Sequence, residues 1–260
     1  MKISISTLPF YPHPLQDILD HIIELNQGYC EIIHEYPHDI SDVDMVNSFD
    51  IEFSVHAPLS DVNVASHNEG IRRSSISLIK KSMDLAVLMG SDIVVVHPGH
   101  MPILGRKIKP KILNFNRDSL QECSKYAQNV GVSMCVENMP DIEGLLFTDL
   151  DELSELVDDI DAYMTLDVGH AHNNQFKAED MLKYPNIKHV HLSDNDGSYD
   201  SHQALGSRSG DGINFPALFR GLKKRGYQGF LVVEVEEPGD VKQSIDFLDN
   251  NLDKQKTIQI

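Results

Sequence analysis

Short runs of branched and apolar residues recur along this chain, and between them apolar positions return every three or four residues. Apolar runs of four to eight residues are typical of buried strands, whereas the longer period is that of amphipathic helices. The pattern predicts eight strands. They are Lys2–Ser6, Tyr29–His34, Ile51–His56, Ser91–His97, Val132–Glu137, Ala162–Asp167, Ile187–Leu192 and Phe230–Val235.

The stretches between these runs carry helix signals. Helical periodicity is clear over residues 15–23, 71–88 and 215–222, and Pro216 lies where a first-turn proline is common. Four glycines follow such stretches at positions typical of helix C-termini, namely Gly28, Gly90, Gly131 and Gly226. The alternation of strand and helix indicates a parallel sheet.

Eight such units without a linker or a shift in composition predict one (β/α)₈ TIM barrel spanning residues 1–260. A doubly wound open sheet with an appended segment is the alternative. The tail after about residue 250 lacks an apolar stripe, so we expect part of it to be disordered.

Composition narrows the class of protein. The chain is 41% apolar, and no apolar run reaches the roughly 18 residues that a membrane span needs. The first residues, MKISISTLPF, do not resemble a signal peptide. The cysteines Cys30, Cys123 and Cys135 form no CxxC pair and fit small buried residues in a reducing compartment. We therefore expect a cytoplasmic protein without a membrane partner.

Metal-ligand side chains stand at the predicted carboxyl ends of six strands. They are His56, His97, Glu137, Asp167, His191 and Glu234. The carboxyl ends of barrel strands meet at one face, so these side chains should converge. His170 follows Asp167 in a glycine-containing turn, and Asp200 and His202 lie in a polar loop. Oxygen and imidazole donors suit Zn²⁺ foremost, with Mn²⁺ or Fe²⁺ as alternatives. For Asp200 and His202, a solvated turn is the alternative interpretation.

Other polar residues are secondary candidates. His189 lies on the same face of its strand as His191 but one layer deeper, so we expect it to pack in the interior or to form a supporting hydrogen bond rather than to bind metal. Glu236 competes with Glu234 as a ligand, and His100 lies on the rim, where it could contact substrate. Arg208 lies in a Gly/Ser-rich loop before a helix, which is either an anion site or a flexible surface loop.

The motifs resemble the xylose-isomerase-like TIM-barrel superfamily, and within it the endonuclease IV branch (AP endonuclease family 2). The resemblance runs from about Ile51 to Glu237 and rests on HAPLSDVNVA, VVHPGH, VENMPD, LDVGHAH, HLSDNDGSYDSHQALG and VVEVEEP. It implies three metal ions held by nine residues. One ion is held by His56, His97 and Glu137, a second by Glu137, Asp167, His191 and Glu234, and a third by His170, Asp200 and His202.

Sugar isomerases and epimerases of the superfamily are similar too, and the resemblance implies that they need mainly the second group. Endonuclease IV proteins carry arginine-rich and aromatic loops that enter the DNA minor groove. Here the loop after the second strand, HEYPHDI, is acidic, and Leu59 stands where an aromatic residue is expected. With a formal charge of −18, a small phosphorylated or sugar substrate is expected rather than duplex DNA.

Two reactions fit these residues. The first is metal-assisted hydrolysis of a phosphoester on a trinuclear site, with Arg208 holding phosphate. The alternative is isomerisation or epimerisation of a sugar or sugar phosphate, in which Glu137 and Glu234 move protons on opposite faces of an enediolate and Glu35 contacts hydroxyls. A barrel that only binds a ligand is the third hypothesis, but such a barrel should lose metal ligands, and none is missing.

Overall fold

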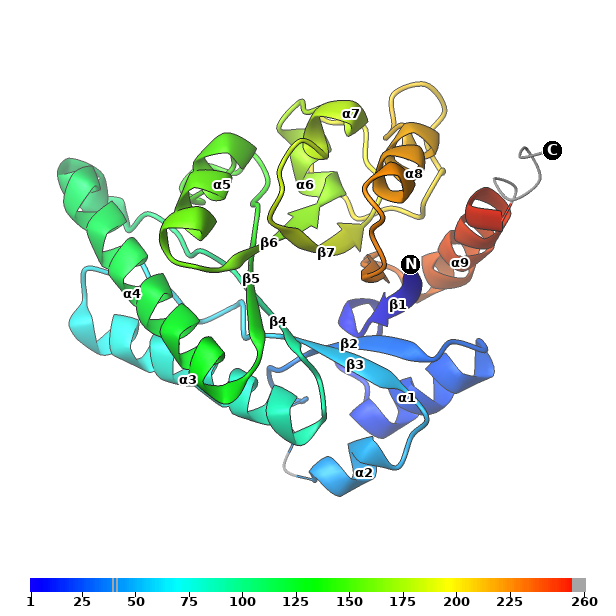
Figure 1. Cartoon of the computed structure of the whole chain (residues 1–260), viewed down its shortest axis with the longest axis horizontal. Coiled ribbons are helices and arrows are strands. Elements are labelled where there is room, and N and C mark those ends of the chain that lie inside the picture. The colour runs from blue at the N-terminus through cyan, green and yellow to red at the C-terminus, as the bar shows by residue number, and fades with distance from the viewer. Residues whose placement is uncertain (39, 41, 254–260) are drawn as a thin grey trace.

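Eight parallel strands close into a barrel in the order of the sequence, with the last strand pairing with the first (Figure 1). The computed structural model describes residues 1–38, 40 and 42–253. The strands are β1 (Lys2–Ser6), β2 (Tyr29–Ile33), β3 (Glu52–His56), β4 (Ile93–Val96), β5 (Ser133–Glu137), β6 (Tyr163–Asp167), β7 (Ile187–Leu192) and β8 (Phe230–Val233). Closure confirms the predicted (β/α)₈ barrel and excludes the open sheet.

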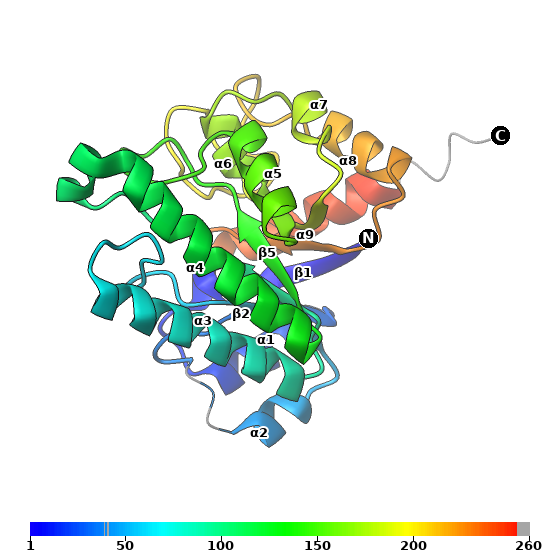
Figure 2. The ribbon, with the colours of Figure 1, turned by 60° about the vertical axis from the view of Figure 1, so that its left-hand side comes forward.

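Helices follow the strands and surround the barrel. They are α1 (Leu15–Glu24), α2 (Val43–Asn47), α3 (Glu69–Leu88), α4 (Lys109–Val130), α5 (Leu150–Asp159), α6 (Val168–Asn173), α7 (Ala178–Met181), α8 (Phe215–Lys224) and α9 (Pro238–Asp253). Figure 2 shows the two longest, α3 and α4, side by side. The rest of the tail that we expected to be partly disordered, residues 254–260, lies outside the described residues.

Three strands end earlier than predicted, and the first of them, β2, ends at Ile33 rather than at His34. β4 ends at Val96 and β8 at Val233, so His97 and Glu234 each fall one residue beyond their strand. His97 precedes a proline, and the residue before a proline is conformationally restricted. The backbone N–H of Glu234 still donates to the carbonyl of Leu192 at 3.0 Å, which keeps Glu234 aligned with β7. Both side chains therefore remain at the carboxyl edge of the barrel.

The two faces of the strands have different compositions. Alternate strand residues that point outward, such as Val94 and Val96, belong to the large apolar core between the strands and the helices. The other parity lines the barrel interior, where a small apolar cluster of Ile93, Val95 and Cys135 is present. Polar residues with no exposed surface share that interior parity: Ser4, Ser6, Glu31, Ser54, Thr165 and His189. A barrel interior this polar needs internal hydrogen bonds, because unpaired buried polar groups are costly.

Two further expectations bear on the class of protein. Cys30, Cys123 and Cys135 are all buried free thiols, as predicted. Among the helices in the described part of the chain, none combines the length and apolar character needed to cross a bilayer.

Gly131 offers a direct test of the helix ends. It caps α4 with φ of 84°, a left-handed conformation that costs an L-residue about 1–2 kcal/mol. Gly131→Ala should lower the free energy of unfolding, measured by urea denaturation, by about that amount. Gly28→Ala is the control, because neither glycine has an atom near its added Cβ and Gly28 lacks the positive φ. Equal stabilities of the two variants would contradict this account.

Candidate metal centre

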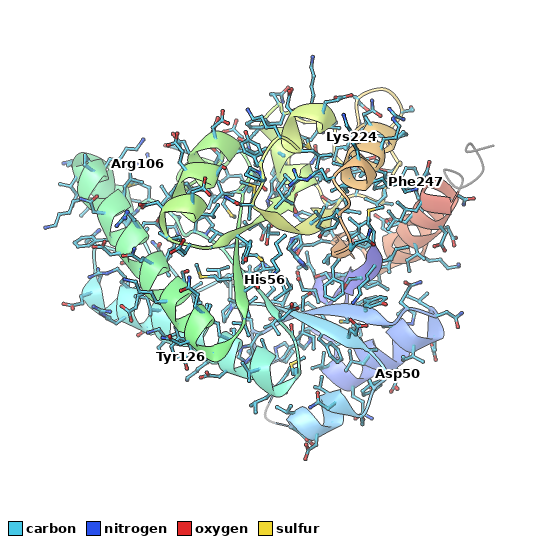
Figure 3. The ribbon with its side chains drawn as sticks, in the orientation of Figure 1. Asp50, His56, Arg106, Tyr126, Lys224 and Phe247 are labelled. Atoms are coloured by element: carbon cyan, nitrogen blue, oxygen red, sulfur yellow. The ribbon has the colours of Figure 1, made fainter. Side chains whose placement is uncertain are left out.

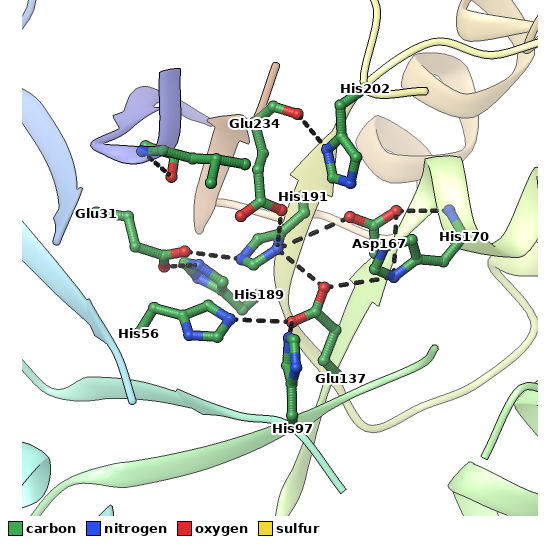
Figure 4. A network of polar contacts seen from close by, with 12 residues as sticks. Glu31, His56, His97, Glu137, Asp167, His170, His189, His191, His202 and Glu234 are labelled. Atoms are coloured by element: carbon green, nitrogen blue, oxygen red, sulfur yellow. Dashed lines mark hydrogen bonds and ion pairs between the residues drawn. The ribbon is translucent and has the colours of Figure 1, made fainter. Parts of the chain in front are cut away.

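All nine predicted metal ligands converge at the carboxyl edge of the barrel, in three groups. Figure 3 places His56 in the middle of the molecule, and Figure 4 shows Glu137 among His56, His97 and His191. Within each group, one possible ligand atom per residue lies within 4.8 Å of the others. The first group is His56, His97 and Glu137; the second, here called the four-residue group, is Glu137, Asp167, His191 and Glu234; the third is His170, Asp200 and His202. Glu137 belongs to two of them.

The two carboxylate oxygens of Glu137 face different groups. Its Oε2 lies 3.3 Å from His56 Nε2 and 3.2 Å from His97 Nε2. Its Oε1 lies 3.3 Å from His191 Nδ1 and 3.5 Å from His170 Nδ1. A carboxylate divided in this way has the geometry of a bridging ligand, which a single imidazole nitrogen cannot provide.

Asn138 ties β5 to β6 immediately after Glu137. Its side-chain amide donates to the carbonyl of Asp167, and its side-chain oxygen accepts from the backbone N–H of Asp167, both at 2.9 Å. Asp167 then caps α6, because its Oδ1 accepts from the backbone N–H of His170 at 2.7 Å. His170 therefore lies in the first turn of a short helix rather than in an irregular turn. Its Nδ1 donates to the carbonyl of Asn138 at 2.8 Å.

The third group is fixed by the loop after β7. Asp200 Oδ2 lies 3.1 Å from both His170 Nε2 and His202 Nε2. His202 Nδ1 donates to the backbone carbonyl of Glu234 at 2.7 Å, which links this loop to the end of β8. His202 has a φ of 39°, a costly conformation for a residue other than glycine. The solvated-turn alternative does not describe these two residues, because both contact other members of the centre.

Asp194 anchors the same loop and was missed by the sequence reasoning. Its carboxylate accepts from four backbone N–H groups, those of Asn195, Gly206, Arg208 and Ile213. A single Asp after a strand carries no signal of such a role, because the loop must fold before the donors converge.

Burial and neighbouring charges set the ionisation of the centre. Burial acts to raise the pKa of Glu137, but the charges of His191 and His97 outweigh it and hold that pKa well below its usual range. Burial raises the pKa of Asp167 to about 6. Burial acts to lower the pKa of His202, yet the Asp200 carboxylate raises it to about 9. Protonated histidines thus balance the buried carboxylates, a role that a bound cation would take over.

Unsatisfied atoms show that the centre fits a divalent ion. Asp167 Oδ2, Asp200 Oδ1 and His191 Nδ1 are buried without a well-aligned hydrogen-bond partner in the described part of the chain. Buried polar atoms are nearly always paired, so a cluster of unpaired donor atoms needs an explanation. These atoms belong to the residues that could ligate a metal, and their oxygen and nitrogen donors are those that Mn²⁺, Zn²⁺ and Mg²⁺ accept.

The predicted substrate contacts lie outside the three groups. The guanidinium of Arg208 donates to both carboxylate oxygens of Asp211, at 3.2 and 2.6 Å, so its charge is already paired. Glu35 accepts from two backbone N–H groups of the loop after β3 and lines a cavity of about 150 Å³. His100 shares a cavity of about 50 Å³ with His97, which places it next to the first group.

The two secondary candidates occupy different environments. Glu236 is exposed and joins none of the groups, in contrast to Glu234. His189 is fully buried, and its Nε2 lies 2.7 Å from Glu31 Oε2, so it forms the predicted supporting hydrogen bond. Glu31 itself was missed. It stands in the middle of the strand run YCEII, and only its charge inside a buried strand signals a special role.

The chain belongs to the xylose isomerase-like TIM barrel family, whose model matches residues 43–251. It is 34% identical to an uncharacterized protein of Methanocaldococcus jannaschii over 97% of this chain and 90% of that protein. A crystal structure of a D-tagatose 3-epimerase-like protein has a TM-score of 0.89 and 31% identity, covering 98% of both chains. Fructoselysine 3-epimerase of Escherichia coli O157:H7 is 25% identical over 66% of this chain and 63% of that protein.

These similarities make the chain an enzyme of this family. They confirm the superfamily that the motifs resemble, and the similar proteins that are named as enzymes include sugar epimerases and an inosose dehydratase. Of the two reactions that the sequence left open, they favour the second. They do not support phosphoester hydrolysis specifically.

Metal binding should stabilise the folded chain measurably. Adding Mn²⁺ to metal-stripped protein at about 100 times its dissociation constant should raise the free energy of unfolding by about 2.7 kcal/mol. His191→Ala should remove most of that gain, because His191 contributes to the four-residue group. Gln128→Ala, on α4 away from the centre, is the control and should keep it. If thermal unfolding of the wild-type protein ignores Mn²⁺, Mg²⁺ and Zn²⁺ alike, the centre is not a metal site.

Proposed function

We propose that this enzyme epimerises a ketose sugar at the carbon next to the carbonyl, with a divalent ion in the four-residue group. The observation that carries the proposal is the placement of two carboxylates. Glu137 ends β5 and Glu234 follows β8, yet they lie 3.3 and 2.9 Å from the same nitrogen, His191 Nδ1. Two carboxylates that face one space from separate strands can reach a substrate from two sides.

The donor set supports one resident ion. Three carboxylates and one imidazole form the four-residue group, and carboxylate-rich sets suit Mn²⁺ or Mg²⁺. When bound, such an ion would polarise the C2 carbonyl and C3 hydroxyl oxygens of the ketose and so acidify the C3–H bond.

Glu137 and Glu234 supply the proton transfers. Burial acts to raise the pKa of Glu234, but His191 outweighs it, and the pKa is lowered, as it is for Glu137. One ionised carboxylate takes the C3 proton, and the electron pair moves onto the C2 oxygen. The other carboxyl, protonated in the reacting form, delivers its proton to the opposite face of C3. The Glu137 charge acts to raise the pKa of Glu234, because like charges disfavour joint ionisation, although His191 outweighs this effect in the metal-free chain.

The surroundings of the centre favour an unphosphorylated sugar. Arg208 is held by Asp211, so phosphate binding would have to break a bidentate ion pair. Glu35 and His100, which line cavities at the same edge of the barrel, offer an acceptor and a ring nitrogen for sugar hydroxyls. Glu137 and Glu234 are 1% and 5% exposed, so both carboxylates are shielded from bulk water.

Glu137→Gln and Glu234→Gln test the acid–base pair. Each variant should lower the rate of C3 epimerisation of a ketohexose such as D-tagatose by about 10²–10⁴-fold, because a general acid–base group is lost. The rate is measured by NMR in D₂O, which also reports exchange of the C3 proton. Glu236→Gln, two residues from Glu234 and exposed, is the matched control. A Glu234→Gln variant with the wild-type rate would contradict the proposal.

Phosphoester hydrolysis is the second candidate, and a specific observation favours it. His170, Asp200 and His202 have ligand atoms close enough together to bind a further ion. Epimerisation with one ion does not require this group. Two of the three groups share Glu137, and together the three groups match the ligand sets that the endonuclease IV resemblance implies for three ions.

Metal content separates the two candidates. Protein purified without chelator should contain about one tightly held ion per chain if it is an epimerase. Asp200→Asn should leave that ion in place, because Asp200 lies outside the four-residue group. A content of about three ions, falling in this variant together with phosphodiesterase activity, would support the hydrolase and contradict the epimerase.

A further inference from the structure

Glu31 is a fully buried carboxylate in the middle of β2. Its Oε2 accepts from Ser54 Oγ at 2.8 Å and lies 2.7 Å from His189 Nε2. Its Oε1 lies 2.9 Å from His191 Nε2. The proton transfers assigned to Glu137 and Glu234 make no use of this carboxylate, although it contacts a member of the four-residue group.

The contacts of Glu31 cross the barrel interior. Ser54 is its register partner on the neighbouring strand β3, whereas His189 and His191 stand on β7. β2 pairs with β1 and β3 only, so the contact with β7 must pass through the lumen. Figure 4 shows the Glu31 carboxylate facing both imidazoles, on the opposite side of His191 from Glu137.

The two ring nitrogens of His191 thus have separate environments. Nε2 faces Glu31, while Nδ1 lies 2.9 Å from Glu234 and 3.3 Å from Glu137. A neutral imidazole binds a metal through the nitrogen that carries no proton, so its proton must sit on the other nitrogen. With an ion in the four-residue group, Nδ1 would carry no proton, and the Glu31 carboxylate, which only accepts hydrogen bonds, would then hold the remaining proton on Nε2.

We propose that Glu31 is a positioning residue that holds His191 with Nδ1 directed at the four-residue group. Ser54 and His189 in turn hold Glu31. Metal-bound imidazoles commonly donate their second N–H to a carboxylate, and loss of that partner typically costs 10–100-fold in metal affinity. The inference rests on the proposed function only in taking His191 as a metal ligand.

The alternative of a separate ion at Glu31 is disfavoured by its contacts. Glu31, His189 and His191 also meet the spacing of a metal group, and all three are fully buried. However, the Oε2 atom of Glu31 is already shared by a hydroxyl and an imidazole. A carboxylate engaged by Ser54, His189 and His191 together is a support for side chains rather than an open ligand.

Glu31→Gln tests the inference, because glutamine keeps the volume and removes the charge. We expect the dissociation constant of Mn²⁺, measured by calorimetry on metal-stripped protein, to rise about 10–100-fold. Glu52→Gln is the matched control; it changes an exposed glutamate on β3 and should leave the constant unchanged. A Glu31→Gln variant that binds Mn²⁺ as tightly as the wild type would overturn the inference, even if its metal-free form is less stable.

If the Glu31→Gln variant does not fold, Ser54→Ala provides a second test of the same inference. This substitution removes one hydrogen bond to Glu31 and leaves His191 unchanged. The affinity for Mn²⁺ should therefore fall, but by a smaller factor than in Glu31→Gln. Unchanged affinity in this variant would count against the inference. The readout needs no sugar turnover: a wild-type protein that binds Mn²⁺ but epimerises no ketose would refute the proposed function and leave the role of Glu31 intact.

Discussion

The rest of the centre depends on the contacts that the Glu137 carboxylate makes with two groups of ligands. Its two oxygens face different groups, with His56 and His97 on one side and His191 on the other. Glu137 can occupy this point only because β5 ends there and Asn138 locks the next strand beside it. The barrel thus turns the end of one strand into the meeting point of ligands from several others.

This arrangement is accompanied by polar side chains in the interior of the barrel. Barrels of this type usually fill their lumen with branched apolar side chains, whereas this one buries Glu31, Ser54 and His189 beneath the centre. Hydrogen-bonded side chains in such an interior orient one another more sharply than apolar packing does. The large apolar core between strands and helices, which includes Phe215 and Phe219, carries the stability instead.

Much of this structure could be predicted from the sequence, for physical reasons. The spacing of apolar residues and the positions of glycine and proline predicted the strands to within two residues. Convergence at the strand ends predicted six of the nine candidate ligands, whereas His170, Asp200 and His202 were predicted from a turn and a polar loop. The pairing of Arg208 with Asp211 and the anchoring of a loop by Asp194 could not be predicted, because both depend on how a long loop folds. Glu31 was missed because its histidine partners lie across the lumen, more than 150 residues away in sequence.

The most direct test of the account is to locate the ion itself. Anomalous scattering from crystals grown with Mn²⁺ should show a strong peak in contact with Glu137, Asp167, His191 and Glu234. His191 should contact that peak through Nδ1 while Nε2 faces Glu31. A peak bound elsewhere, or an empty four-residue group at saturating Mn²⁺, would contradict the central claim that this group is the metal centre of the enzyme.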